Sequence, residues 1–265
     1  MTAYKWDAAE YARSSTGQLG WARELIAKLD LQGGERILDI GCGDGKVSAE
    51  LASGLATGSV LGVDNSPEMV ALAETVFPPM KHPNLRFRLA DAVALPFRNE
   101  FDVVFSNATL HWVLDHAPVL EGIAGSLKPG GRILIQMGGR GNAAAVVAAS
   151  DIVRARPEWR DSFAGFQFPY GFYGPEEYRD WLEAAGLVPL RVELLQKDMA
   201  HKDRTAFEGW LRTTWLPYTQ RIAEERREAF VQQVADQYLD DNPASPDGVV
   251  HLAMVRLEVE AKKES

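Results

Sequence analysis

The feature that most constrains the fold is a glycine-rich turn between an apolar run and a helix-like stretch. The segment RILDIGCGDGKVSAEL covers residues 36–51 and contains Gly41, Gly43 and Gly45. Glycine adopts positive φ angles without strain and lets a ligand approach the backbone closely. A short buried strand, a glycine turn and a helix in this order predict the first unit of a ligand-binding α/β protein.

Several ligands bind at turns of this kind, and the residues of the turn separate them. A Walker-type phosphate loop needs G-x-x-x-x-G-K-[ST], but Ile40 stands at its first position and Val47 replaces the hydroxyl residue. A dinucleotide fingerprint needs a third glycine where this chain has Lys46. A tight turn that binds nothing stays open. The acidic Asp39 before the turn favours a ligand that carries positive charge.

Short apolar runs alternate with helical segments as far as residue 137. The pattern predicts strands at 36–40, 58–64, 84–91, 101–107 and 132–137, and helices at 18–30, 45–55, 66–77 and 119–131. Ser66 and Pro67 mark the start of the third of these helices as N-cap and first helical residue. Such alternation predicts a parallel sheet with helices on both faces.

The pattern changes after residue 137. We expect helices at 143–156, 175–187, 204–220 and 225–239, an aromatic stretch at 157–174 and strands at 188–199 and 248–263. The expected fold class is α/β: a doubly wound, mostly parallel, seven-stranded Rossmann-like sheet with an antiparallel edge strand and an added helical lid. We expect one domain over residues 1–265, divided into an N-terminal cap (1–20), a cofactor-binding core (21–140), helical lid additions (141–175 and 200–245) and the final edge strand (248–263).

Composition and charge bear on partners and compartment. The formal net charge of −9 disfavours a nucleic-acid partner. Cys42 is the single cysteine, and the five histidines are scattered, so we expect no disulfide and no metal site. No stretch reaches the roughly 18 apolar residues of a membrane span, and the N-terminus lacks the form of a signal peptide. We therefore expect a cytoplasmic monomer or homodimer that binds no membrane.

Five segments resemble the class I S-adenosylmethionine-dependent methyltransferases. LDIGCGDG resembles their first motif, and VLGVDNS and RLADAVALPF place Asp64 and Asp91 at the ends of the next two strands. FDVVFSNATLHWV and LKPGGRILI resemble the family's fourth strand and the approach to its fifth. The resemblance covers about residues 20–140. It implies S-adenosyl-L-methionine as the cofactor and S-adenosyl-L-homocysteine as the product.

The resemblance also implies roles for single residues. Asp64 would accept both ribose hydroxyls, Asp91 and the N–H of Ala92 would contact the adenine, and Tyr11 and Gln18 would reach the methionyl part. Turn-forming or surface roles stay open for the two aspartates, and helix capping by neighbouring residues stays open for the N-terminal segment. The implied cofactor-binding residues are Tyr11, Gln18, Asp39, Gly41, Cys42, Gly43, Asp64, Asn65, Met69, Asp91, Ala92 and Asn107.

The segment SNATLHWVLD narrows the acceptor. It resembles trans-aconitate 2-methyltransferases, juvenile-hormone-acid methyltransferases and malonyl-carrier-protein methyltransferases, which esterify carboxylic acids. We therefore expect methyl-ester formation on a small carboxylic acid, which needs no general base because a carboxylate is an anion at neutral pH. An amine, hydroxyl or ring-carbon acceptor stays open, as does a cofactor-binding protein without catalysis.

No catalytic residue follows from the sequence. His111 is a candidate general base, although a histidine in such a place is more often a structural donor. The candidate substrate-pocket residues are His111, Trp112, Tyr170 and Tyr173, and the candidate cations for an acidic substrate are Arg140, Arg154 and Arg156.

Overall fold

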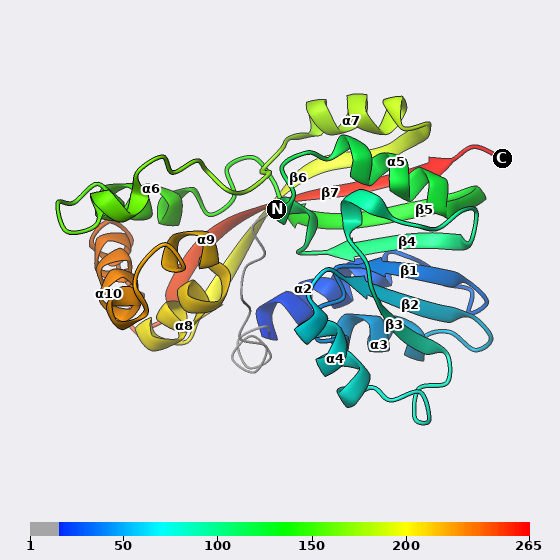
Figure 1. Ribbon diagram of the computed structural model, residues 1–265, viewed down its shortest axis with the longest axis horizontal. Helices are drawn as coiled ribbons and strands as arrows, with labels where there is room; N and C mark the ends of the chain where they lie inside the picture. Colours follow the sequence, from blue (N-terminus) through cyan, green and yellow to red (C-terminus); the bar gives the residue numbers. More distant parts are fainter. Residues whose placement is uncertain (1–15) are drawn as a thin grey trace. The chain divides into compact units, whose positions relative to one another are not determined.

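The computed structural model describes residues 16–265, without the side chains of residues 16–19, and the chain forms two compact units (Figure 1). We call them the sheet unit and the helical unit. Within the described residues, the sheet unit comprises residues 16–140, Tyr170–Leu195 and Arg256–Ser265. Within the described residues, the helical unit comprises Gly141–Pro169 and Gln196–Val255.

The strands form a seven-stranded sheet in the order β3-β2-β1-β4-β5-β7-β6. Pairing is parallel from β3 through β5 and antiparallel between β5 and β7. This arrangement confirms the expected doubly wound, mostly parallel α/β fold. The strands are β1 (Arg36–Ile40), β2 (Ser59–Asp64), β3 (Leu85–Leu89), β4 (Phe101–Asn107), β5 (Leu127–Gly138), β6 (Leu187–His201) and β7 (Val250–Lys263).

One expected position in the sheet is wrong. The final strand does pair antiparallel with β5, but it lies between β5 and β6 and not at the edge, which β6 occupies. The reason is burial: Leu257, Val259 and Ala261 are fully buried on one face, and Glu258 is fully buried on the other. A strand buried on both faces needs a neighbour on each side, whereas the half-exposed pattern of β6 suits an edge.

Helices cover both faces of the sheet. Leu25, Leu51 and Val70 pack from α2, α3 and α4 on one face, and Ile123 and Leu182 pack from α5 and α7 on the other. This double covering explains why the strands read as continuous apolar runs. The helices of the sheet unit are α2 (Thr16–Ala27), α3 (Lys46–Ser53), α4 (Pro67–Val76), α5 (Ala117–Ser126) and α7 (Pro175–Ala184), with 3₁₀ turns η1 (Ala92–Ala94) and η2 (Leu110–Trp112).

Local sequence signals explain where two of these helices begin and end. The Ser66 side chain accepts a hydrogen bond from the Met69 backbone N–H and caps α4, as the sequence predicts. The expected helix over 119–131 ends earlier, at Ser126, and Leu127 already belongs to β5. Proline disfavours helical geometry in the residue before it, so Pro129 ends the helix upstream of itself.

The helical unit is held together by aromatic side chains. Phe230 contacts Trp159 edge-on and stacks on Phe163, with ring centroids 5.5 and 5.4 Å apart. The aromatic stretch at 157–174 is divided, because residues from 170 onward belong to the sheet unit. The helices of the helical unit are α6 (Ala144–Arg154), η3 (Arg160–Phe163), α8 (Arg204–Thr214), α9 (Leu216–Thr219) and α10 (Glu224–Asp241).

No helix within residues 16–265 combines the length and the apolar character that a bilayer crossing requires. Over the same residues, no three histidine, cysteine or acidic side chains are grouped so that they could hold a metal ion.

Candidate functional site

The glycine turn after β1 has the backbone geometry that its sequence predicts. Gly41, Gly43 and Gly45 all have positive φ, at 75°, 51° and 81°. The N–H of Gly41 donates to the carbonyl oxygen of Val63 at 2.7 Å, which fixes the turn against β2. A Cβ added to Gly41 would lie 2.0 Å from the side chain of Thr109. Only glycine therefore fits this position.

Asp39 is a buried acid one residue before the end of β1. Its side chain is covered from solvent, and its Oδ2 accepts a hydrogen bond of 2.5 Å from Ser48 Oγ in α3. Burial raises the pKa of Asp39 to about 7, the Ser48 hydrogen bond opposes the shift, and the nearby Asp64 adds to it. A cation placed beside this carboxyl group would favour its ionised form.

Asp64 at the end of β2 is fixed from two directions. Its Oδ2 accepts from the N–H of Gly43 at 3.0 Å, and its Oδ1 accepts from the N–H of Ser66 at 2.9 Å. Burial still raises the pKa of Asp64 above its ordinary value, because desolvation outweighs these hydrogen bonds. A carboxylate has about four lone-pair sites, more than these backbone donors fill, so the group can accept from a ligand as well.

Three further cofactor candidates lie after β1, in α4 and after β3. Cys42 is buried, and burial raises the pKa of its thiol well above 9, so it is not a reactive nucleophile. Met69 is buried on α4, which begins directly after Asn65 and Ser66. Asp91 caps η1 by accepting from the N–H of Val93 at 3.2 Å. Asp91 thus holds the short turn that begins at Ala92.

Asn107 ends β4. Its Oδ1 is buried and accepts no hydrogen bond from the residues that the structure describes. The preceding Ser106 donates to the carbonyl oxygen of Ile40 at 2.8 Å, which ties the end of β4 to the end of β1. Two other candidates are not tested by the structure, because Tyr11 and the side chain of Gln18 are outside the part of the chain that it describes.

Four rings gather beside the end of β4. His111 and Trp112 in η2 face Tyr170 at centroid distances of 6.1 and 5.1 Å, and Phe172 stacks on Tyr170 at 5.2 Å. The N–H of Gly171 donates to the carbonyl oxygen of His111 at 2.9 Å, which aligns the two segments. The structure therefore brings together three of the four residues expected for the substrate pocket.

Tyr173, the fourth expected residue, points elsewhere. Its hydroxyl donates to the carbonyl oxygen of Leu114, and its ring contacts His116 and Trp181 at 5.0 and 4.7 Å. His116 is buried and holds the end of η2, because its Nε2 lies 3.0 Å from the carbonyl oxygen of Leu110 and its Nδ1 lies 2.6 Å from the hydroxyl of Tyr178. This second cluster therefore supports η2.

His111 is a neutral side chain with a defined tautomer. Burial lowers its pKa well below 6.5, and the positive charge of Arg256 and the nearby His116 lower it further. The N–H of Gly138 donates to Nδ1 at 3.4 Å, so Nε2 carries the hydrogen. His111 therefore presents a hydrogen-bond donor at Nε2.

Comparisons with known proteins agree with this geometry. The family described as "Methyltransferase domain" matches residues 38–135. The trans-aconitate 2-methyltransferase of Variovorax paradoxus is 30% identical over 98% of this chain and 99% of the relative, and that of Streptomyces coelicolor is 34% identical over 81% and 72%. The chain belongs to the S-adenosylmethionine-dependent methyltransferases. The resemblance seen in its sequence motifs is confirmed.

A solved structure extends the comparison to the fold. Phosphoethanolamine N-methyltransferase 2 of Haemonchus contortus, crystallised with S-adenosyl-L-methionine, superimposes with a TM-score of 0.61. It is 20% identical, and the match covers 97% of this chain and 57% of that chain. This methyltransferase therefore shares the fold of that enzyme. Because the chain belongs to the S-adenosylmethionine-dependent methyltransferases, S-adenosyl-L-methionine is its cofactor.

The three arginines expected to meet an acidic substrate have other partners in this methyltransferase. Arg140 forms ion pairs with Glu176 and Glu177 at 3.2 and 2.6 Å and is half exposed. In the helical unit, Arg154 forms an ion pair with Asp151 and lies over the ring of Phe166. Also in that unit, Arg156 donates to the side-chain oxygens of Gln233 and Gln237, at 2.8 and 3.0 Å.

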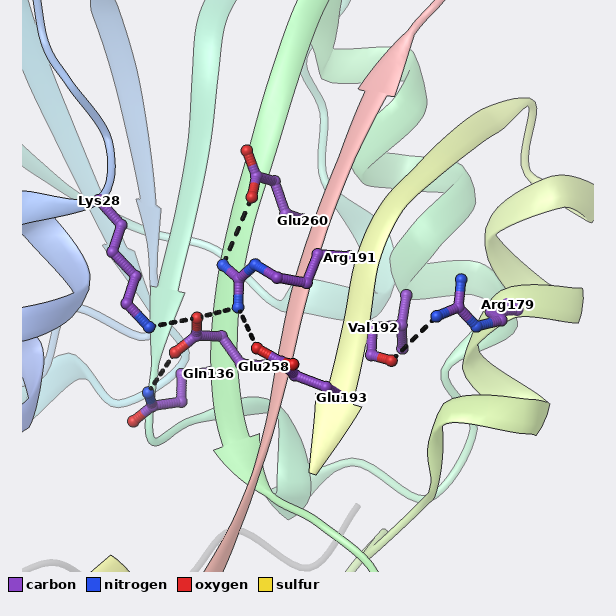
Figure 2. A network of polar contacts seen from close by, with 8 residues as sticks. All are labelled: Lys28, Gln136, Arg179, Arg191, Val192, Glu193, Glu258 and Glu260. Carbon is purple, nitrogen blue, oxygen red and sulfur yellow. Dashed lines mark hydrogen bonds and ion pairs between the residues drawn. The ribbon is translucent and has the colours of Figure 1, made fainter. Parts of the chain in front are cut away.

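A row of polar side chains across β5, β7 and β6 was not predicted from the sequence. Figure 2 shows the buried Glu258 of β7 between Lys28, which directly follows α2, Arg191 of β6 and Gln136 of β5. Lys28 and Gln136 reach it at 2.6 and 2.9 Å, and these donors hold the pKa of Glu258 below its ordinary value despite burial. The signal was the charged alternation in MVRLEVEAKK, where Arg256, Glu258 and Glu260 interrupt an apolar strand.

Proposed function

We propose that this methyltransferase transfers the methyl group to a carboxylate of a small acid and so forms a methyl ester. The supporting observation is the near full-length similarity to relatives named trans-aconitate 2-methyltransferase, which spans 98% of this chain and 99% of one relative at 30% identity. A match of that extent includes the segments outside the cofactor-binding core. The acceptor chemistry of those relatives is therefore the best guide to this one.

The residues of the first two strand ends fit the cofactor. Gly41 has no Cβ, and the place of a Cβ is filled by Thr109, so the glycine lets the turn pack closely against the segment after β4. We assign the ribose hydroxyls to the spare lone pairs of Asp64, and the adenine to Asp91 and the N–H of Ala92. We assign the backbone of the turn, from Gly41 through Gly43 with Cys42, to the methionyl part.

The other assigned residues frame the same ligand. Asn65 and Met69 line the adenosine side, and Tyr11 and Gln18 would close over the methionyl part from the N-terminal segment. The orphaned Oδ1 of Asn107 offers an acceptor at the end of β4. S-adenosylmethionine supplies a methyl group on a positively charged sulfur. We infer that the buried Asp39 is ionised when this positive charge is bound.

Carboxylate methylation suits the chemistry of the acceptor residues. A carboxylate is already an anion at neutral pH, so it needs alignment and exclusion of water but no proton removal. His111 has its hydrogen on Nε2, so it is fitted to donate a hydrogen bond to an acid and not to act as a base there. His111 and the rings of Trp112 and Tyr170 would frame the acceptor.

Two further observations support a small-molecule acceptor and a cytoplasmic location. The net charge of −9 supports a small-molecule acceptor over a nucleic acid. Cys42 is free and buried, which suits the reducing cytoplasm.

A transfer assay with a labelled methyl donor tests the proposal. Small carboxylic acids, amines, phenols and polyamines are offered in parallel, and the product is treated with alkali. We expect label in acids only, released as methanol by alkali because esters hydrolyse there. Stable label in amines or phenols, with none in acids, would contradict the proposal.

A further inference from the structure

Arg256 lies on β7, two residues from Glu258, toward the edge of the sheet where the cofactor is assigned. In the strand register, Asn107 of β4 lies opposite Gln136 of β5, and Gln136 lies opposite Glu258 of β7. Gly138 of β5 lies opposite Arg256 of β7. Alternate residues of a strand point to the same face, so Arg256 shares the face of Glu258 and lies two residues beyond it. The antiparallel pairing brings Arg256 level with the carboxyl end of β5, the edge at which ligands bind in this fold.

The guanidinium of Arg256 is held in place below the surface. Only 3% of the residue is exposed, and its Cζ lies 5.5 Å from the ring centroid of Trp21 on α2. Its positive charge is among the causes that lower the pKa of His111, whose Nδ1 is bound to the N–H of Gly138, the strand partner of Arg256. Arg256 and the Nε2–H of His111 are therefore donors at the same strand end.

We propose that Arg256 binds a carboxylate of the acceptor other than the one that is methylated, so that the enzyme selects acids with at least two carboxylates. This inference rests on the proposed function. A guanidinium offers a planar fork of N–H donors that matches a carboxylate in bidentate fashion, and it keeps its charge at every physiological pH. The neutral His111 adds a donor without a second charge.

Two arguments place the methylated carboxylate elsewhere. Neighbouring strands are about 4.8 Å apart, so the backbone of Arg256, two strands from Asn107, lies about 10 Å from the position expected to face the methyl group. In addition, a bidentate arginine engages both carboxylate oxygens and reduces the electron density that the reaction needs. An anchored second carboxylate leaves the reacting one unshared.

Arg140, two residues after the end of the neighbouring strand β5, is a matched control. Both arginines lie near the carboxyl end of β5, because Arg256 is the strand partner of Gly138 at that end. The side chain of Arg140, however, is 53% exposed and forms ion pairs with Glu176 and Glu177. Replacing Arg140 removes the same charge from a nearby position without touching the buried row. Arg140→Gln should therefore leave acid binding unchanged.

The first experiment measures binding without transfer. Trans-aconitate, fumarate and crotonate are titrated calorimetrically into the S-adenosylhomocysteine complexes of the wild type, Arg256→Gln, Arg256→Lys and Arg140→Gln. Crotonate keeps the carbon skeleton of fumarate but has one carboxylate. We expect the wild type to bind a polycarboxylate more tightly than crotonate, and Arg256→Gln to weaken that binding by about 30-fold without affecting crotonate.

The variants also separate the two carboxylates that an arginine could hold. S-adenosylhomocysteine has a carboxylate of its own, so its affinity is measured for each variant. We expect this affinity to change by less than about 3-fold. A loss of cofactor affinity that matches the loss of acid affinity would assign Arg256 to the cofactor and overturn the proposal.

Failure of this proposal and failure of the proposed function look different. Transfer to acids with unchanged KM in Arg256→Gln would overturn this proposal alone, as would equal binding of fumarate and crotonate by the wild type. Arg256-dependent binding of polycarboxylates without any transfer to them would overturn the proposed function alone. Arg256→Lys keeps the charge and the fold, and we expect an intermediate loss from it; wild-type affinity in this variant would also contradict a bidentate anchor.

Discussion

The proposed donor side and acceptor side of this methyltransferase are built in different ways. The donor side (residues 39–45, 64–69 and 91–92) comes from consecutive strand–helix units. The acceptor side (His111, Trp112, Tyr170 and Arg256) comes from segments far apart in the chain. The first depends on backbone geometry and the second on side-chain packing. The residues that bind the methyl donor can therefore be predicted from local sequence, whereas the residues that bind the methyl acceptor cannot.

The two sides also differ in charge. The donor side has two buried acids, Asp39 and Asp64, whose pKa values burial raises. The acceptor side has a buried arginine, Arg256, beside a neutral histidine, His111. A cationic cofactor suits the first set and an anionic acceptor suits the second. Substitutions on one side should therefore leave the other side's ligand unaffected.

The largest effect is expected from Gly41→Ala. Gly41 has φ of 75°, and an added Cβ would meet Thr109 at 2.0 Å. We expect the free energy of unfolding to fall by at least about 3 kcal/mol and S-adenosylhomocysteine binding to be lost, as measured by denaturant unfolding and calorimetry. Gly186→Ala is the control, because Gly186 has φ of 77° with no atom within 4 Å of the added Cβ. It should cost about 1 kcal/mol and leave binding intact; equal costs would refute the collision argument.

A pH-dependent effect is expected from Asp39→Asn. The folded pKa of about 7 lies above the ordinary 3.8, so the fold favours neutral Asp39. The resulting stability is complete below pH 4 and is lost as the pH rises through 7. Wild type should therefore lose on the order of 3 kcal/mol relative to Asp39→Asn between pH 4 and 8.

Unfolding by urea at both pH values checks this prediction. The raised pKa of Asp64 persists in the variant, so any slope that remains in Asp39→Asn reports on Asp64. Parallel pH profiles for the two proteins would show that Asp39 is already ionised in the fold.

Asp64→Asn should act mainly on the cofactor. The variant loses a charged acceptor for the ribose hydroxyls, so we expect S-adenosylhomocysteine to bind about 30-fold more weakly by calorimetry, equivalent to about 2 kcal/mol. Ser66→Ala is the control: it removes the cap of α4, at a cost of about 1 kcal/mol in stability, but no proposed cofactor contact. Unchanged affinity in Asp64→Asn would assign Asp64 to the turn alone.

The smallest effect is expected from Tyr178→Phe, which acts on the cluster that supports η2. Nε2 of His116 faces two carbonyl oxygens and carries the hydrogen, so the hydroxyl of Tyr178 donates to Nδ1. Tyr178→Phe leaves Nδ1 buried without this donor and should cost about 1 kcal/mol of stability. We expect the acceptor KM to rise while cofactor affinity stays constant.

Ser126→Ala is the comparison for this last variant. It deletes another hydroxyl hydrogen bond, to the carbonyl oxygen of Gly122 in α5, away from η2. Stability should fall slightly and KM should stay constant. A rise in cofactor Kd for Tyr178→Phe would show that the two sides are not independent.

Strand and helix positions could be predicted where the signals are local. The β4 segment 101–107 was predicted to the residue, and Ser66 caps α4 as expected. The end of α5 and the place of β7 were wrong, because the first depended on the effect of Pro129 on its predecessors and the second on burial of both faces of the strand. Pairing between distant strands leaves no periodic mark in the sequence.

The sequence by itself determined the cofactor. Gly41, Asp39 and Asp64 lie close together along the chain, and the positive φ angles and strand ends that they need are properties of short segments. Only the tertiary structure decided which arginine lies with His111. The sequence offered Arg140 as a candidate and did not single out Arg256, but Glu176 and Glu177 hold Arg140 at the surface, whereas antiparallel pairing with β5 buries Arg256. Burial and charge pairing are set by long-range packing, which no local pattern encodes.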